Sequence, residues 1–202
     1  AFAPTLNSFN GATNLQLVVK DIHSDALAQE EISKIKVYDH RKKTDILAQV
    51  NDYIKTSKMG VSVFVEDVKI KETLKPYQNI YEKIINRQTA DKNDVLMFFD
   101  YPCDDEVLNS VKQKVCASTF HYMNYQNYKA DEEAILKTFS GMIRYTCNNL
   151  EGKFVLSRGA TALGVTEEVI ETLLEIFQDC EMIKINSREN DFYNIEFVKG
   201  IE

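Results

Sequence analysis

The first strongly patterned segment of the chain is a candidate β-hairpin near its start. Leu15, Leu17 and Val19 alternate with the residues between them, as in a half-buried strand, and Asn10-Gly11 is a typical tight hairpin turn. Two strands alone do not form a stable unit in water. We therefore expect this hairpin to be the last part of a β-barrel whose earlier strands lie upstream in a longer protein, followed by a polar connector over residues 23–33.

The next part of the chain has a pattern that predicts alternating strands and helices. Strands are expected at residues 35–38, 61–65, 95–99 and 119–123, and helices at residues 44–57, 71–86 and 104–114, with Thr44 capping the first helix. The continuous apolar run at 95–99 is typical of a strand buried on both faces of a parallel sheet. The alternation predicts right-handed β-α-β crossovers in a small, open, mostly parallel α/β sheet.

The pattern changes near residue 127. Helices are expected at 130–148, in a short segment ending at Leu163-Gly164-Val165, and at 166–180 with Thr166 as its cap, while strands are expected at 154–156, 182–185 and 192–198. A polar turn at 187–191 joins the last two strands. This order is typical of a winged helix with a helix-turn-helix at its centre. The sequence thus predicts an α/β protein divided into residues 1–33, 34–126 and 127–202.

Charge restricts the classes of partner. The 202 residues carry a net charge of −7, which argues against a broad DNA-binding surface because such surfaces neutralise phosphates with Lys and Arg. The predicted helix at 166–180 would be the recognition helix of a winged helix, yet it holds five carboxylates and no Lys or Arg. A wing contact to DNA through Lys184 and Arg188 is one interpretation, but a solvated turn is the favoured explanation of these two residues.

Candidate chemistry is sparse. No phosphate-binding glycine loop follows a predicted strand, and the three histidines have no metal-binding or catalytic spacing. The densest basic cluster, Arg41-Lys42-Lys43, follows the first strand of the α/β region, at the edge where open sheets bind ligands. Two interpretations remain open: the cluster grips phosphate or the carboxylates of an acidic peptide, or it is a solvated loop.

The remaining composition indicates a cytoplasmic protein. No apolar run approaches the roughly 20 residues needed to span a bilayer, and no secretory leader pattern is present. The four cysteines are far apart in the sequence. Such cysteines are usually small buried apolar residues, and we expect neither disulfides nor a zinc site.

Several phrases of the sequence resemble the C-terminal region of the RecJ family of single-stranded-DNA-specific exonucleases, in the form found in Firmicutes-type bacteria. The hairpin over residues 9–22 resembles the closing strands of the family's OB-fold. Residues 37–41, Val-Tyr-Asp-His-Arg, resemble the start of its C-terminal domain, although Lys42-Lys43 stand where the family often has glycine. The strand ending Phe-Asp-Tyr-Pro at residues 99–102 and the helix with Leu163-Gly164-Val165 are also similar.

The resemblance implies a function for the parent protein. Such an enzyme degrades single-stranded DNA from its 5′ end in repair and recombination, using a catalytic core in which Asp and His bind Mn²⁺ or Mg²⁺. The Asp-His-His motif of that core does not occur in this sequence, so we expect the chain to be inactive by itself, with no cofactor of its own. It would recruit a partner or position the core, and Arg41, Lys42 and Lys43 would bind an acidic peptide such as the tail of single-stranded-DNA-binding protein.

Two other functions are compatible with the sequence. Direct binding of single-stranded DNA would use aromatic platforms beside cations, with Phe9, Lys184 and Arg188 as candidate contacts, together with the tyrosines at 122, 125 and 128. A free-standing winged-helix interaction protein is the other possibility. The hairpin at the start argues against the free-standing protein, and an upstream Asp-His-His motif in the gene would rule it out.

Overall fold

A computed structural model describes residues 2–9, 12–19, 35–43, 46–123 and 132–198. The chain forms two compact units, Ala1–Ile35 and Lys36–Glu202. The expected connector at 23–33, Thr44 as a cap, and Tyr125 and Tyr128 lie outside the described residues. The finer division of the chain at residue 127 stays a prediction.

The first unit contains the hairpin that the sequence predicts. Strand β1 (Phe2–Phe9) pairs antiparallel with β2 (Ala12–Val19), and the register places Phe9 opposite Ala12. Only residues 10 and 11 remain to connect the strands, as expected for an Asn-Gly turn.

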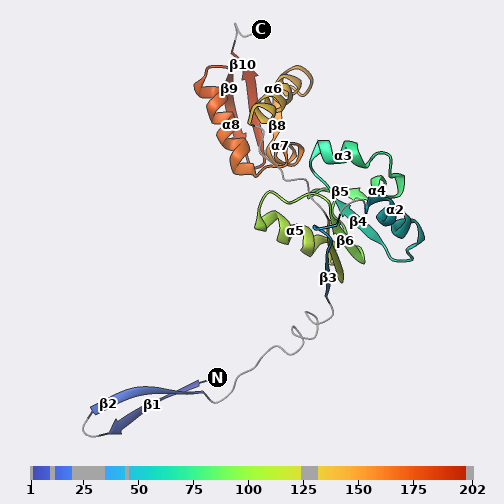
Figure 1. The fold of residues 1–202 in the computed structure, drawn as a ribbon. Helices are drawn as coiled ribbons and strands as arrows, with labels where there is room; N and C mark the ends of the chain where they lie inside the picture. The colour runs from blue at the N-terminus through green and yellow to red at the C-terminus, as the bar shows by residue number, and fades with distance from the viewer. Residues whose placement is uncertain (1, 10–11, 20–34, 44–45, 124–131, 199–202) are drawn as a thin grey trace. The chain divides into compact units, whose positions relative to one another are not determined.

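The second unit begins with a five-stranded sheet in which every neighbouring pair is parallel (Figure 1). Its strands are β3 (Lys36–Asp39), β4 (Val61–Phe64), β5 (Ile84–Ile85), β6 (Val95–Phe98) and β7 (Thr119–Tyr122), in the spatial order β3-β7-β6-β4-β5. All side chains of β4 and β6 are buried. The apolar run at 95–99 is therefore a central strand, as its sequence predicts.

Helices cover both faces of the parallel sheet. Helices α2 (Leu47–Thr56), α3 (Val68–Leu74) and α4 (Gln78–Tyr81) supply Ile54, Leu74 and Ile80 to the core on one face. On the opposite face, α5 (Asp105–Val115) packs Val111 and Val115 against strand residues such as Phe64 and Phe98. The predicted α/β class is thus confirmed for this part of the chain.

The single helix predicted at 71–86 is wrong. Asp67 caps a helix that starts earlier, because its carboxylate accepts a hydrogen bond of 2.9 Å from the Ile70 N–H. Pro76 then ends the helical ladder, since proline lacks the N–H and its ring clashes with the preceding turn. Helix α4 follows, and Ile84–Ile85 form the short strand β5 that pairs with β4.

The rest of the unit forms a second core around a small antiparallel sheet. The elements are α6 (Glu132–Asn149), β8 (Lys153–Val155), α7 (Leu156–Leu163), α8 (Glu167–Asp179), β9 (Ile183–Glu189) and β10 (Phe192–Phe197). The strand order is β8-β10-β9, and Phe139, Ile170, Leu174 and Ile183 are among the residues of the core. Thr166 caps α8 as predicted, with its hydroxyl accepting from the Val169 N–H.

Two further predictions need correction. The polar turn expected at 187–191 is shorter, because Ser187, Arg188 and Glu189 continue strand β9 and only Asn190 and Asp191 turn the chain. Cys103, Cys116 and Cys180 are exposed rather than buried, and Cys147 is half-buried. All four thiols are free. No helix among the described residues is long and apolar enough to cross a membrane.

Candidate functional site

The basic loop, residues Arg41, Lys42 and Lys43, follows β3 at the carboxyl edge of the parallel sheet, as predicted. The Arg41 guanidinium forms a bidentate pair with the Asp39 carboxylate, with an Nη2–Oδ2 distance of 2.6 Å. This pairing holds the pKa of Asp39 well below its usual range. All three cationic side chains are exposed, so the loop presents positive charge to solvent with part of it compensated by Asp39.

A cluster of rings lies beside the basic loop, made by Tyr38, His40, Tyr53 and His121. Tyr38 is the register partner of His121 on β7, and His40 lies two residues further along the same face. The Tyr38 and His121 ring centroids are 4.9 Å apart, and Nε2 of His40 is 3.1 Å from Nδ1 of His121. Tyr53 of α2 adds a ring 6.2 Å from that of His121.

The two histidines favour their neutral forms. Burial, together with the smaller effect of the nearby His40, lowers the pKa of His121 to about 4. Burial also lowers the pKa of His40, with Lys43 acting in the same direction. A hydrogen bond between two imidazoles needs one nitrogen as donor and the other as acceptor, so the bond itself requires an unprotonated ring. The ring cluster is therefore a largely uncharged aromatic surface next to a cationic loop at neutral pH.

The middle of the carboxyl edge is filled by the protein's own carboxylates. Connections leave β4 and β6 in opposite directions, which makes the crevice between them the place where open sheets usually bind ligands. Here Oδ2 of Asp100 accepts hydrogen bonds from the N–H groups of Glu66 and Asp67, at 2.8 and 2.6 Å. Burial raises the pKa of Asp100, and these two bonds oppose that rise. A phosphate would meet a carboxylate in this crevice instead of free N–H groups.

A buried ion pair adjoins this crevice. The Glu66 side chain is 2% exposed and the Arg87 side chain 13%. Nε of Arg87 donates to Oε1 of Glu66 at 2.8 Å, and Nη2 donates to Oε2 at 2.5 Å. Burial alone would lower the pKa of Arg87, but the bonds to Glu66 outweigh it and the pKa is raised. Nη1 also donates to the carbonyl of Val165 at 2.9 Å, so each of the three nitrogens of the guanidinium forms a structural contact.

The structure places Lys184 and Arg188 on β9, each beside a carboxylate. Lys184 Nζ lies 3.3 Å from Oε1 of Glu196. Arg188 pairs with Glu171 of α8, and its guanidinium lies over the ring of Tyr193, 5.2 Å from the ring centroid. These contacts reduce the positive charge that a phosphate would encounter.

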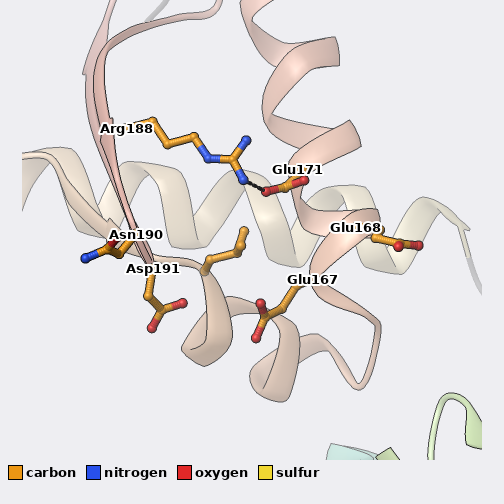
Figure 2. A pocket seen from close by; sticks show the side chains of 7 residues that line it. Glu167, Glu168, Glu171, Arg188, Asn190 and Asp191 are labelled. Carbon is orange, nitrogen blue, oxygen red and sulfur yellow. Dashed lines mark hydrogen bonds and ion pairs between the residues drawn. The ribbon is translucent and has the colours of Figure 1, made fainter. Parts of the chain in front are cut away.

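Arg188 also lines a pocket of about 350 Å³ between α8 and the turn from β9 to β10 (Figure 2). Four of the seven lining side chains are carboxylates, those of Glu167, Glu168, Glu171 and Asp191. One of them is structural, because Asp191 accepts hydrogen bonds from the backbone N–H and hydroxyl of Ser157 at the start of α7. The pocket is acidic and does not suit an anionic ligand.

The structure places two of the candidate DNA contacts, Lys184 and Arg188, on the same strand, β9. Phe9 ends β1 in the first unit, and its side chain is not among those described. Lys184 and Arg188 belong to the small antiparallel sheet, whereas the basic loop follows the parallel sheet. Among the described residues, no group of three or more His, Cys, Asp or Glu side chains could hold a metal ion.

Sequence reasoning located the basic loop but missed the ring cluster. His40 and His121 are 81 residues apart, and no local pattern connects them. The two histidines could have been connected only by knowing that the first and last strands of the sheet pair with each other. The sequence does not reveal this strand order. No protein-family model, curated protein or solved structure matches this chain.

Proposed function

We propose that this chain is the C-terminal accessory region of a 5′→3′ single-stranded-DNA exonuclease of RecJ type, acting in repair and recombination. In this proposal the chain is not catalytic and recruits a partner protein or positions the nuclease core. The Mn²⁺ or Mg²⁺ of the enzyme then belongs to a catalytic core elsewhere in the parent protein. The parent enzyme acts on single-stranded DNA in the cytoplasm.

The finer fold assignments belong to the same proposal. The β1–β2 hairpin would be the closing pair of an OB-fold, and α6 to β10 would be a winged helix. The order of three helices and a hairpin supports the winged helix, as does the short connection between α7 and α8. There Gly164 adopts a left-handed conformation with φ of 63° and Thr166 caps α8, a geometry suited to a helix-turn-helix.

The basic loop is the observation that carries the proposed recruitment function. Its three cations are exposed in a chain of net charge −7, on the side of the sheet formed by the carboxyl ends of the strands, where α/β proteins bind ligands. The proposed winged-helix region has little uncompensated positive charge to bind phosphates. Helix α8 carries five carboxylates, and the cations of β9 lie beside Glu171 and Glu196. An acidic peptide therefore fits the charge distribution better than a long stretch of DNA.

Fluorescence anisotropy tests the proposal with a labelled acidic tail peptide of single-stranded-DNA-binding protein, and with labelled oligo-dT as the parallel ligand. We expect saturable binding of the peptide and weak binding of the oligonucleotide. The triple variant R41A/K42A/K43A should weaken peptide binding about tenfold, since an exposed ion pair contributes roughly 0.2–1 kcal/mol.

A matched control is the variant K58A/K137A/R144A. It also removes one arginine and two lysines, all of them exposed and outside the basic loop, and should bind the peptide as the unmodified chain does. Equal weakening by both triple variants would show that only net charge matters and would contradict the assignment to the basic loop. Absence of peptide binding would contradict the recruitment function itself.

Direct binding of single-stranded DNA is the second candidate, and the surroundings of Tyr122 favour it. The Arg41 guanidinium lies 5.9 Å and the Lys112 ammonium 5.7 Å from the centroid of its ring. An aromatic ring with cations beside it is a common element of single-strand binding sites. If this candidate holds, oligo-dT binds more tightly than the peptide and the affinity falls steeply with added salt.

A further inference from the structure

Among the described strands, β3 forms an edge of the parallel sheet and pairs on one side only. The sheet order places β7 beside it, and no other described strand pairs with β3. All four of its residues are exposed, including Val37 at 59% and Tyr38 at 45%. Exposed edge strands are templates for pairing with another chain, and proteins usually protect them. The opposite edge, β5, has only two residues, both half-buried.

The backbone groups on the open side of β3 can be identified from its ladder with β7. The N–H of Lys36 donates to the carbonyl of Ser118, and the N–H of His40 donates to the carbonyl of Tyr122. Successive residues of a strand direct their backbone groups to opposite sides. Val37 and Asp39 therefore direct their N–H and C=O groups away from β7, where an added strand could pair with them.

The charges around this edge select the kind of segment that would pair. Lys36 lies at the start of β3 and the basic loop at its end, while Asp39, the one carboxylate of the strand, is bound by Arg41. An extended acidic segment would align its carboxylates with these cations along the strand. Tyr38 adds an apolar contact on one face and Val37 adds another on the opposite face.

We propose that the acidic partner peptide binds by strand addition to the open edge of β3, pairing with the backbone of Val37 and Asp39 while the basic loop holds its carboxylates. This inference rests on the proposed recruitment function and adds the mode of binding and the chemistry of the partner. The partner segment is acidic and extended in the bound state. Its successive side chains point to opposite faces of the sheet.

Backbone methylation of the peptide tests strand addition without changing the protein. Two isomers of the labelled acidic tail peptide are compared, one N-methylated at alternate amides and the other at the amides between them. In strand addition only one of these sets faces β3. One isomer should therefore bind at least about tenfold more weakly, which corresponds to about 1.4 kcal/mol, and the other should bind much as the parent peptide does.

The outcomes separate the two proposals. If the parent peptide binds but the isomers bind equally to each other, strand addition is refuted while recruitment through the basic loop stands. If the parent peptide does not bind, the recruitment function itself is refuted. If the peptide binds but R41A/K42A/K43A does not weaken binding, the assignment to the basic loop is refuted, and strand addition beside that loop with it. A difference between the isomers, together with sensitivity to the triple variant, supports both.

A pair of variants tests the same edge from the side of the protein. Val37→Pro removes the outward N–H at a position where an edge strand tolerates proline, whereas Val37→Ala keeps the N–H and removes most of the side chain. We expect V37P to weaken peptide binding about tenfold, with V37A affected less. A V37P protein that folds and binds the peptide as tightly as V37A overturns the proposal, and the peptide isomers decide if V37P does not fold.

Discussion

Replacing Arg87 by alanine is expected to destabilise the protein by about 3–5 kcal/mol, because it leaves a buried carboxylate without its cation. The Glu66 side chain is only 2% exposed, so its carboxylate depends on the guanidinium to compensate its charge. Three side-chain hydrogen bonds from Arg87 to Glu66 are lost, as is the bond to the carbonyl of Val165. The magnitude follows from the uncompensated charge more than from the number of bonds.

Thermal unfolding followed by circular dichroism measures this effect. Each kcal/mol shifts Tm by roughly 2–4 °C in a protein of this size, so R87A should unfold about 10 °C earlier. Lys75→Ala is the control, because its ion pair with Glu72 is more than half exposed on both sides and should contribute at most about 1 kcal/mol.

A second variant isolates the contribution of charge. Adding Glu66→Gln to R87A removes the lone buried charge, and the double variant should recover part of the lost stability. If R87A loses no more stability than K75A, or if E66Q/R87A is no more stable than R87A, the pair does not act as a buried ion pair and the reasoning fails.

Two other predictions follow from the carboxyl edge of the sheet. Because the pKa of Asp100 is raised in the folded state, the contribution of this group to stability is present below pH 3.8 and falls as pH rises above that value. Urea unfolding at several pH values should therefore show that the stability of the unmodified chain relative to D100N decreases as pH rises. D100A should cost about 1–3 kcal/mol because two N–H groups lose their acceptor. The pKa of His121 is lowered from 6.5 to about 4, so its contribution to stability is present above pH 6.5 and is lost as pH falls towards 4. An NMR titration of its ring proton should give a midpoint well below 6.5, and H121Q should show less acid destabilisation. A midpoint near 6.5 would contradict the lowering of the pKa by partial burial of the ring.

The sequence was most informative where periodicity and burial agree. The run at 95–99 is apolar at every position and forms a central strand, and the Thr166 cap with its amphipathic helix lies where the pattern predicts it. The prediction failed at 71–86 because Ile84–Ile85 fit a helical period as well as a short strand. Pairing with β4, which the local sequence does not encode, decided between the two.

The candidate site was only partly predictable for the same reason. The position of the basic loop followed from a general property of parallel sheets, in which ligand-binding loops follow the carboxyl ends of strands. The ring cluster and the Glu66–Arg87 pair both depend on contacts between residues far apart in the sequence. Those contacts follow from the strand order, which helix and strand periodicity do not determine.

The position of β3 also has a consequence for the order in which the protein acquires its structure during synthesis. Lys36 pairs with Thr119, so β3 leaves the ribosome roughly eighty residues before its partner strand. Closing so long a loop is slow, and a nascent chain would hold this strand unpaired while β4, β5 and β6 come together. The cations beside β3 would then act as gatekeepers, because their mutual repulsion discourages two nascent chains from pairing through the same edge.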